Sequence, residues 1–239
     1  MEKSTIQQIE ARFDKDVERF SKLETGQQTT LDASLNLELI TEGIVRCYPK
    51  LGRVLDIGCG AGNFAVKLAQ KRPDIQVTLS DLSLPMLNRA KERVTPLTSG
   101  AVQTIKGDFR TADFGQQKYD VIIATAVLHH LRDDKDWETA FGKLYHLLND
   151  QGSIWIFDLV HQADQGLQAY FYEDLYGSYL TSLKDADYRD QVFAYIEKED
   201  TPRSLIYQLN LLEKTGFKRV DVLHKKLCFA SFVGFKSVK

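Results

Sequence analysis

The stretch VLDIGCGAGNF, residues 54–64, runs from a short apolar segment into three closely spaced glycines. A strand followed by glycines and a helix places backbone N–H groups and a helix N-terminus against an anionic ligand group. The glycines follow the spacing G-x-G-x-G, at Gly58, Gly60 and Gly62. A dinucleotide-binding fold prefers G-x-G-x-x-G and an apolar residue where this strand has Asp56. The loop therefore predicts a ligand site of another kind, or else a tight strand-to-helix turn without a ligand.

The chain beyond this loop alternates short apolar runs with helical patterns. Strands are predicted at 53–57, 75–80, 102–107, 120–126 and 153–160, and helices at 63–71, 84–93, 137–148 and 201–215. Gly216 ends the last helix, and the tail after it reads as two adjacent strands, one of them antiparallel at the sheet edge. The predicted fold is α/β: a Rossmann-like, doubly wound sheet of seven strands, mostly parallel with an antiparallel final strand.

Two regions outside this alternation have a different composition. Residues 1–50 are polar and amphipathic, with Ile9, Phe13, Val17 and Phe20 at helical spacing, and predict an N-terminal helical cap. Residues 51–239 would form the main domain. It carries an insertion at about 161–200 that is rich in Tyr and Phe, and this composition indicates helices over a pocket.

Composition narrows the classes of function. The 239 residues are 43% hydrophobic, which suits one large domain, and a net charge of −2 disfavours a nucleic-acid partner or an anionic membrane. The charged first 20 residues lack the apolar core of a signal peptide, and no run approaches the roughly 18 apolar residues of a membrane span. Three widely spaced cysteines indicate neither a disulfide framework nor a metal site. We expect a cytoplasmic protein, a monomer or homodimer, with no membrane partner.

Two aspartates follow consecutive predicted strands. Asp81, in SDLS, comes after the second strand, and Asp108, in GDFR, comes after the third. Either one alone could simply cap a helix. Together, after a glycine loop, they would meet at the crevice where open α/β sheets bind ligands, with Asp81 accepting from ribose hydroxyls and Asp108 from an adenine amino group.

The motifs VLDIGCGAG, LSDLSLPML, IKGDFR and YDVIIATAVLHHL together resemble those of class I S-adenosylmethionine (SAM)-dependent methyltransferases, over about residues 50–160. The resemblance implies SAM as the cofactor and a small-molecule acceptor as the substrate. It places the methionine part of SAM at the glycine loop, ribose at Asp81, adenine along Leu82 and Met86, and the adenine edge at Asp108 and Phe109. Thr125 and Ala126 would flank the methyl donor. The loop residues implied are Asp56, Gly58, Cys59, Gly60 and Gly62.

Two adjacent histidines, His129 and His130, follow the fourth predicted strand. Both could cap the loop and pack against the next helix. Alternatively one of them, His129 by preference, faces the acceptor as a base or orienting donor, since an ordinary histidine pKa of about 6.5 suits that role. His130 would then point into the helix packing. Adjacent side chains diverge and no third ligand is evident, so no metal site is expected.

Aromatic residues are the candidates for acceptor binding. Tyr172 and Tyr176 lie in QAYFYEDLYGSYL (168–180), and Phe13 begins FDKDVERF (13–20), which resembles the helix that closes over the cofactor in many such enzymes. Both stretches could equally be helices with one packed face.

The C-terminal segment LLEKTGFKRVDVLHKKLCFASFVGFK is similar to carboxy-S-adenosylmethionine synthases of tRNA wobble-uridine modification. That family holds the carboxylate of its cofactor with an arginine, and Leu211 occupies the corresponding position here. The departure favours plain methyl transfer. A non-catalytic SAM-binding protein is the other alternative, and a nicotinamide-dependent oxidoreductase is disfavoured by the glycine spacing.

Overall fold

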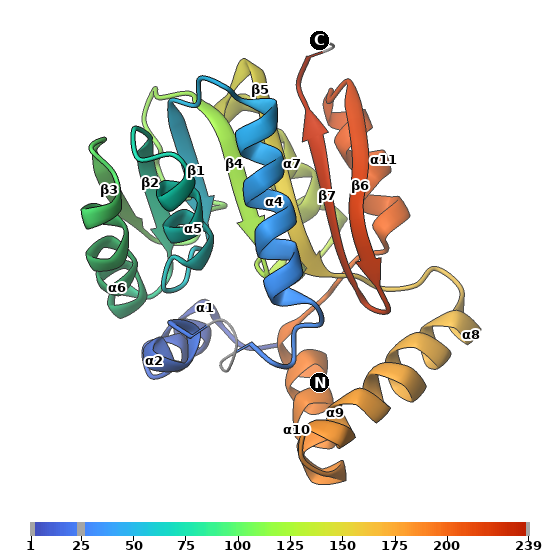
Figure 1. Cartoon of the computed structure of the whole chain (residues 1–239). Helices are drawn as coiled ribbons and strands as arrows, with labels where there is room; N and C mark the ends of the chain where they lie inside the picture. The colour runs from blue at the N-terminus through green and yellow to red at the C-terminus, as the bar shows by residue number, and fades with distance from the viewer. Residues whose placement is uncertain (1–2, 23–26, 238–239) are drawn as a thin grey trace.

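The computed structural model describes residues 3–22 and 27–237, and its centre is one seven-stranded sheet (Figure 1). The strand order is β3-β2-β1-β4-β5-β7-β6. Strands β1 to β5 pair in parallel, and β7 is antiparallel to both β5 and β6. The bounds are Arg53–Ile57 (β1), Gln76–Asp81 (β2), Val102–Lys106 (β3), Tyr119–Thr125 (β4), Leu148–Leu159 (β5), Arg219–Lys226 (β6) and Phe229–Phe235 (β7). The predicted sheet, mostly parallel with an antiparallel final strand, is confirmed.

The sequence pattern predicted that the antiparallel strand lies at the edge of the sheet. This prediction was wrong, because β7 lies inside the sheet. A tight turn at Leu227, with φ +50°, sends β7 back between β5 and β6. The two strands differ in composition: β7 (FASFVGF) is buried along nearly all its length, whereas every residue of β6 (RVDVLHKK) is exposed or half-buried. An apolar strand needs neighbours on both edges and cover on both faces, so β6 takes the edge.

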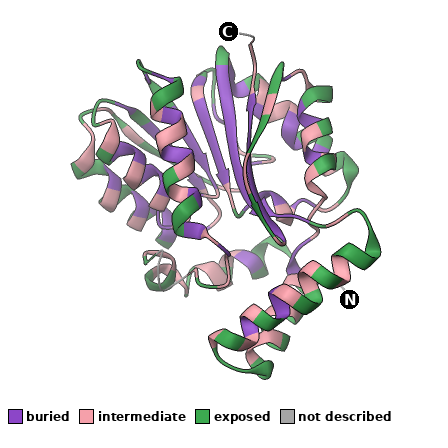
Figure 2. Cartoon of the chain, turned by 45° about the vertical axis from the view of Figure 1, so that its right-hand side comes forward, coloured by how far each residue is buried: buried purple, intermediate pink, exposed green. Residues whose placement is uncertain are grey.

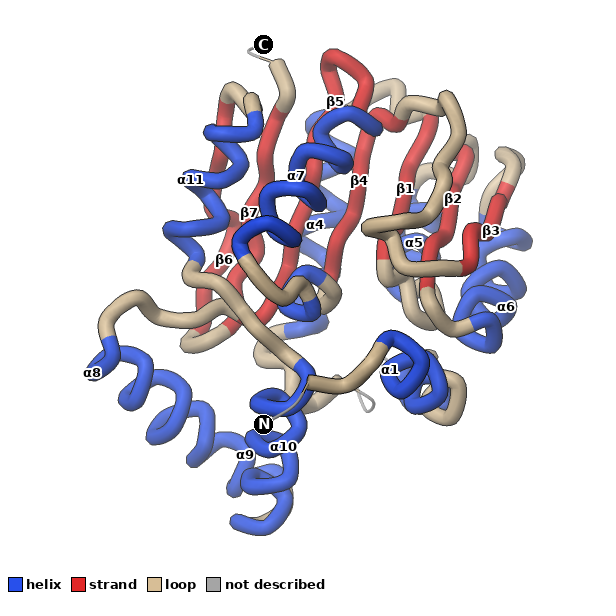
Figure 3. The backbone as a smooth tube through the Cα atoms, turned by 180° about the vertical axis from the view of Figure 1, so that it is seen from behind, coloured by secondary structure: helices blue, strands red, loops and turns tan. Residues whose placement is uncertain are grey.

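Helices cover both faces of the sheet (Figures 1 and 3). Helices α4, α5 and α6 lie on one face, and α7 and α11 on the other. Because successive strand residues point to opposite faces, Val121 and Ile123 join the first hydrophobic core while Ile122 joins the second. The bounds of these helices are Ala33–Cys47 (α4), Asn63–Lys71 (α5), Leu84–Val94 (α6), Asp134–Leu147 (α7) and Leu205–Thr215 (α11). The buried central strands stand out in Figure 2.

Local sequence explains where the helices begin and end. Asp133 caps α7 by accepting from the N–H of Asp136, and Ser83 and Ser204 cap α6 and α11 in the same way. Gly216 has φ +122° and ends α11, as its position predicts. Short 3₁₀ turns lie at Thr95–Leu97 (η1) and Leu128–His130 (η2).

The stretch expected as a cap divides into two parts. Helices α1 (Ile6–Phe13) and α2 (Val17–Phe20) lie across the carboxyl ends of the parallel strands, whereas α4 packs on the sheet, where its Gly43 faces the Trp155 ring. Arg12 anchors α1 through an ion pair of 2.9 Å with the buried Glu199. No helix in the described ranges is long and apolar enough to cross a membrane.

The region expected as a helical insertion forms an arm that projects from the body of the molecule (Figure 1). It contains α8 (Gln165–Gln168), a π-helical segment η3 (Ala169–Tyr176), α9 (Gly177–Leu183) and α10 (Ala186–Glu199). Its inner aromatic residues pack together: Tyr172 stacks on Phe193, with 4.7 Å between ring centroids, and Tyr176 meets Phe229 of β7 edge-on. The arm therefore has its own aromatic core, joined to the end of the sheet.

Candidate functional site

The three glycines of the β1–α5 loop all have positive φ, but each is required for a different reason. At Gly58 (φ +60°) a Cβ would lie 2.5 Å from Val127 Cγ2, and at Gly62 (φ +80°) it would lie 2.9 Å from Ala90 Cβ. At Gly60 (φ +51°) a Cβ would meet nothing within 4 Å. Gly58 and Gly62 thus permit close packing, while Gly60 leaves its backbone open toward a cavity.

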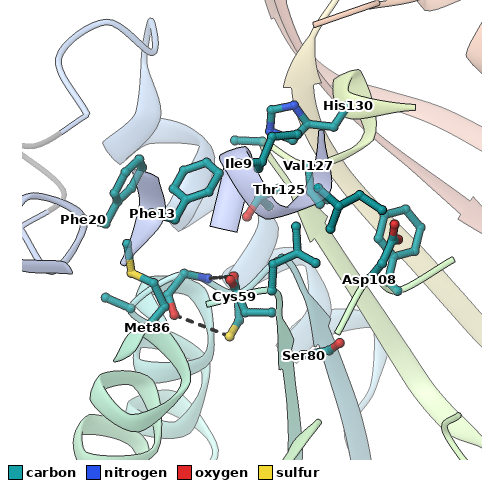
Figure 4. Close-up of a pocket in the computed structure, with 18 of the residues that line it drawn as sticks. Ile9, Phe13, Phe20, Cys59, Ser80, Met86, Asp108, Thr125, Val127 and His130 are labelled. Carbon is teal, nitrogen blue, oxygen red and sulfur yellow. Dashed lines mark hydrogen bonds between the residues drawn. The ribbon is translucent and has the colours of Figure 1, made fainter. Parts of the chain in front are cut away.

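That cavity, of about 340 Å³, lies at the carboxyl ends of β1, β2, β3 and β4. Most of the residues predicted to bind the cofactor line it: Gly58, Cys59, Gly60, Asp81, Leu82, Met86, Asp108, Phe109, Thr125 and Ala126. Ile9, Phe13 and Phe20 of the amino-terminal segment close it from the side opposite Cys59, Met86 and Ser80 (Figure 4). We call it the cofactor cavity.

Asp81 joins the glycine loop to the next loop. One carboxylate oxygen accepts from the N–H of Gly60 at 2.8 Å, and the other accepts from the N–H of Ser83 at 2.9 Å. Burial raises the pKa of Asp81, although these N–H groups oppose the shift. Each carboxylate oxygen can accept a further hydrogen bond, so Asp81 can receive a pair of hydroxyl groups from the cavity.

Asp108 is held by an arginine that the sequence analysis did not single out. Arg110 binds both carboxylate oxygens of Asp108, at 2.5 to 3.0 Å, and also reaches Asp136 of α7 at 2.7 Å. These contacts fix the Asp108 carboxylate at the cavity wall, beside the buried Phe109. An oriented acceptor next to an aromatic face suits the edge of a purine ring.

Asp56 and Gly62 do not line the cofactor cavity. Asp56 is only 1% exposed, and its carboxylate oxygens have no hydrogen-bond partner within the described part of the chain. Burial raises the pKa of Asp56 to about 8, and the nearby charge of Asp81 adds to the shift. Asp56 is therefore a buried carboxyl outside the cofactor cavity, and its surroundings favour the protonated form.

A second cavity, of about 300 Å³, adjoins the first. The two share a border of Phe13, Phe20, Gln27, Thr30, Ala126, His130 and Phe157. Ala126, just after β4, has φ +51°, a strained conformation for a residue with a side chain. The second cavity is otherwise lined mainly by the arm, with Tyr176, Tyr188, Tyr195 and Phe229 among its aromatic residues. We call it the aromatic cavity.

The three residues expected to bind the acceptor have different positions. Phe13 borders both cavities, and Tyr176 lines the aromatic cavity while its hydroxyl donates to the carbonyl of Thr29 at 2.7 Å. Tyr172 lines neither cavity: it is half-buried, stacks on Phe193 of the arm and lines a separate hollow with His161 and Glu197.

His129 lines the aromatic cavity, and its orientation is fixed by a buried carboxylate of β5. Its ring Nδ1 contacts Asp158, which also accepts from the backbone N–H groups of Leu128 and His129. Burial disfavours the charged ring, but Asp158 and Asp200 outweigh it and raise the pKa of His129 to about 9. The expectation of an ordinary histidine pKa at this position was wrong, because both carboxylates come from distant parts of the chain.

His130 does not point into helix packing, contrary to the expectation from its position. It lines both cavities, with its ring edge-on to Phe13 at 6.3 Å between centroids. Burial lowers the pKa of His130, and the neighbouring His129 lowers it further. Its Nδ1 lies 3.0 Å from Asp200 Oδ1. The two histidine rings are only 4.3 Å apart, so the premise that adjacent side chains diverge was also wrong.

Sequence reasoning missed Asp158 and Asp200. Asp158 had a local signal, a carboxylate inside the otherwise apolar run SIWIFDLV, where a charge needs a buried partner. Asp200 had none, since it follows α10 in a charged stretch and reaches the histidines only through the folding of the arm.

Comparisons with known proteins concern the domain and its fold. A family profile described as a methyltransferase domain matches residues 54–152. A carboxy-S-adenosyl-L-methionine synthase of Campylobacter lari is 28% identical over 209 residues, covering 84% of each chain. Magnesium protoporphyrin IX methyltransferase from Synechocystis, solved with bound S-adenosylhomocysteine (SAH), has the same fold: TM-score 0.63, 17% identity, 97% of this chain and 99% of that one. Human N-acetylserotonin methyltransferase, in complex with SAM, also has this fold. Its TM-score is 0.60 at 19% identity, and the match covers 96% of this chain and 57% of the human one.

Residues 54–152 thus match a methyltransferase domain, and the fold of the chain is the one that SAM-dependent methyltransferases have. The cofactor cavity fits SAM, the ligand present in the human structure. Gly60 lets a ligand approach the backbone, Asp81 offers two acceptors for ribose hydroxyls, and Phe109 offers an aromatic wall for adenine. When bound, SAM supplies an electrophilic methyl group on its sulfonium centre.

Proposed function

We propose that this enzyme transfers a methyl group from SAM to a small-molecule acceptor that binds in the aromatic cavity. The observation that carries the proposal is the shared border of the two cavities, which includes Ala126, His130 and Phe157. An acceptor in one cavity and a methyl donor in the other would meet at this border. Methyl transfer is an in-line displacement, so holding the two reactants in that relation provides most of the catalysis.

The size and chemistry of the aromatic cavity favour a compact, largely apolar acceptor. Its volume of about 300 Å³ lies at the small end of the range of ligand pockets. Phe13, Phe20 and Phe157 supply an apolar wall near the border, while His129 and Asp200 supply polar groups deeper inside. An acceptor whose oxygen or nitrogen loses a proton during transfer would present that atom at the shared border, beside His130 and with His129 behind it. We propose both histidines as the residues that act on that atom.

The named relatives favour a second candidate function, the synthesis of carboxy-S-adenosylmethionine. The resemblance places the carboxylate-binding arginine at Leu211, and here Leu211 is 5% exposed in the hydrophobic core beside α7. A side chain at that position does not reach the cofactor cavity within one chain. We therefore rank methyl transfer first, and a competition between SAM and its carboxylated form in calorimetry would reverse that order if the carboxylated form bound more tightly.

The proposed cofactor site is tested through Asp81. Asp81→Ala removes a charged acceptor from two backbone N–H groups and from the ligand, so the affinity for SAH should fall by about 1–3 kcal/mol. Asp74→Ala is the matched control, because Asp74 is an exposed aspartate that pairs with Arg72 outside both cavities. Titration calorimetry with SAH measures both variants. Equal affinity in wild type and Asp81→Ala would remove Asp81 from the site.

A further inference from the structure

Three potential metal ligands converge on the wall of the aromatic cavity. His129 Nε2 lies 3.7 Å from Asp200 Oδ1, and His130 Nδ1 lies 3.0 Å from the same oxygen. Each of the three residues has one potential ligand atom that lies within 4.8 Å of those of the other two. Metal–ligand bonds of about 2.0–2.2 Å place two ligands of one ion about 3–4 Å apart. We propose that His129, His130 and Asp200 bind a divalent transition-metal ion such as zinc.

Two buried atoms of this cluster are otherwise unexplained. His130 Nδ1 and Asp200 Oδ1 are not aligned for a hydrogen bond with each other despite their short separation, and neither has another hydrogen-bond partner in the described ranges. The Asp200 side chain is only 3% exposed. Among the residues that the structure describes, the two histidine rings are the only basic groups close to this oxygen, and an ion held between it and both rings would be a ligand partner for the oxygen and for the histidine nitrogen together.

Asp158 orients the cluster in the manner of many metal sites. It holds the Nδ1 of His129, which leaves Nε2 of the same ring as the atom directed toward Asp200. Metal-binding histidines almost always donate their other ring nitrogen to a carboxylate, a carbonyl or water, and this contact fixes the ring for coordination. Asp158 itself is 1% exposed and also accepts from three backbone N–H groups, so its position is fixed by the fold.

The composition of the cluster indicates the kind of ion. Two imidazoles and one carboxylate suit zinc, iron or cobalt better than magnesium or calcium, which prefer oxygen ligands. Three protein ligands leave a coordination position open, as in catalytic zinc sites. All three residues line the aromatic cavity, so that position would face an acceptor bound there. This last step rests on the proposed function: an acceptor oxygen on the ion would be oriented and made more acidic.

Cobalt is the probe for the site, because protein-bound Co²⁺ has visible absorption bands that report its ligands. The 239-residue chain is freed of metal by a chelator and titrated with Co²⁺ at mildly alkaline pH, where fewer protons compete with the ion for the histidine ligands. We expect one ion per chain. Asp200→Asn should weaken cobalt binding at least tenfold, and Asp158→Asn about 10–100-fold through the misoriented ring. His146→Gln, at an exposed histidine of α7, is the control and should bind like wild type.

The outcome is read together with SAH binding, measured by calorimetry on the same samples. Asp200 does not line the cofactor cavity, so Asp200→Asn should keep its affinity for SAH while it loses cobalt. That pattern supports the metal site. Absence of cobalt bands in wild type, or unchanged bands in Asp200→Asn, overturns the metal site and leaves the proposed function intact. Failure of the wild type to bind SAH would instead count against the proposed function, whatever the cobalt titration shows.

Discussion

The same substitution at two glycines of one loop should separate cofactor binding from stability. Gly60→Ala places a methyl group where the structure has no atom within 4 Å, on a backbone that opens into the cofactor cavity. Gly62→Ala places it 2.9 Å from Ala90 Cβ, outside that cavity. Both positions have positive φ, so both variants carry backbone strain, and the difference between them lies in what the new methyl group meets.

The magnitudes follow from these contacts. A left-handed alanine costs about 1–2 kcal/mol, which is the whole expected loss of unfolding free energy in Gly60→Ala. Gly62→Ala adds a packing conflict between α5 and α6 that cannot be relieved by rotating a side chain, because Ala90 has only its Cβ. Such conflicts cost about 1–3 kcal/mol, so the total loss should be about 2–5 kcal/mol. For SAH, Gly60→Ala should lose at least tenfold in affinity, or about 1.4 kcal/mol.

Urea denaturation gives the free energy of unfolding for each variant, and calorimetry with SAH gives the affinity of the folded protein. We expect Gly60→Ala to be the more stable variant and the weaker binder, and Gly62→Ala to be less stable with an affinity within about twofold of wild type, roughly 0.4 kcal/mol. If Gly60→Ala bound SAH as tightly as wild type, the backbone of Gly60 would not be where the ligand comes close. If Gly62→Ala were the weaker binder, the assignment of packing and binding roles within the loop would be reversed.

Two further predictions concern a buried carboxyl and an ion pair. The pKa of Asp56 rises on folding from 3.8 to about 8. The contribution of Asp56 to the free energy of unfolding is therefore fully present below pH 3.8 and is lost as the pH rises from 3.8 to about 8. The unfolding free energy of wild type should therefore fall over this range relative to Asp56→Asn, and a pH-independent difference between the two would contradict the shift. Arg12→Ala leaves the buried Glu199 without its ion pair, so α1 should detach locally, with faster proteolysis of the amino-terminal segment and weaker SAH binding but little loss of global stability. The exposed Arg19→Ala is its control, and equal proteolysis of the two variants would show that α1 is held by other contacts.

Much of the fold could be predicted because its signals are local. Strand β1 and helix α5 span the predicted residues 53–57 and 63–71. The other predicted helices and strands recur with bounds shifted by a few residues, and the largest shift is in β5, which begins five residues before its predicted start. The place of β7 was missed because the order of two adjacent strands depends on which one the rest of the molecule can bury. The division of residues 1–50 was missed for a similar reason, since an amphipathic helix has the same pattern whether it packs on a sheet or closes a cavity.

The sequence by itself determined the alternation of strands and helices, the glycine loop and the two aspartates at the carboxyl ends of β2 and β3. These features follow from the chain's own geometry: period-2 and period-3.6 patterns, positive φ at glycine, and strands whose ends must meet at one edge of a parallel sheet. Only the tertiary structure decided the surroundings of His129 and His130. Asp158 reaches them across the sheet from β5, and Asp200 from the end of the arm. Contacts between segments so far apart in the sequence depend on how whole elements pack. A local sequence pattern does not specify which distant segment a residue will contact.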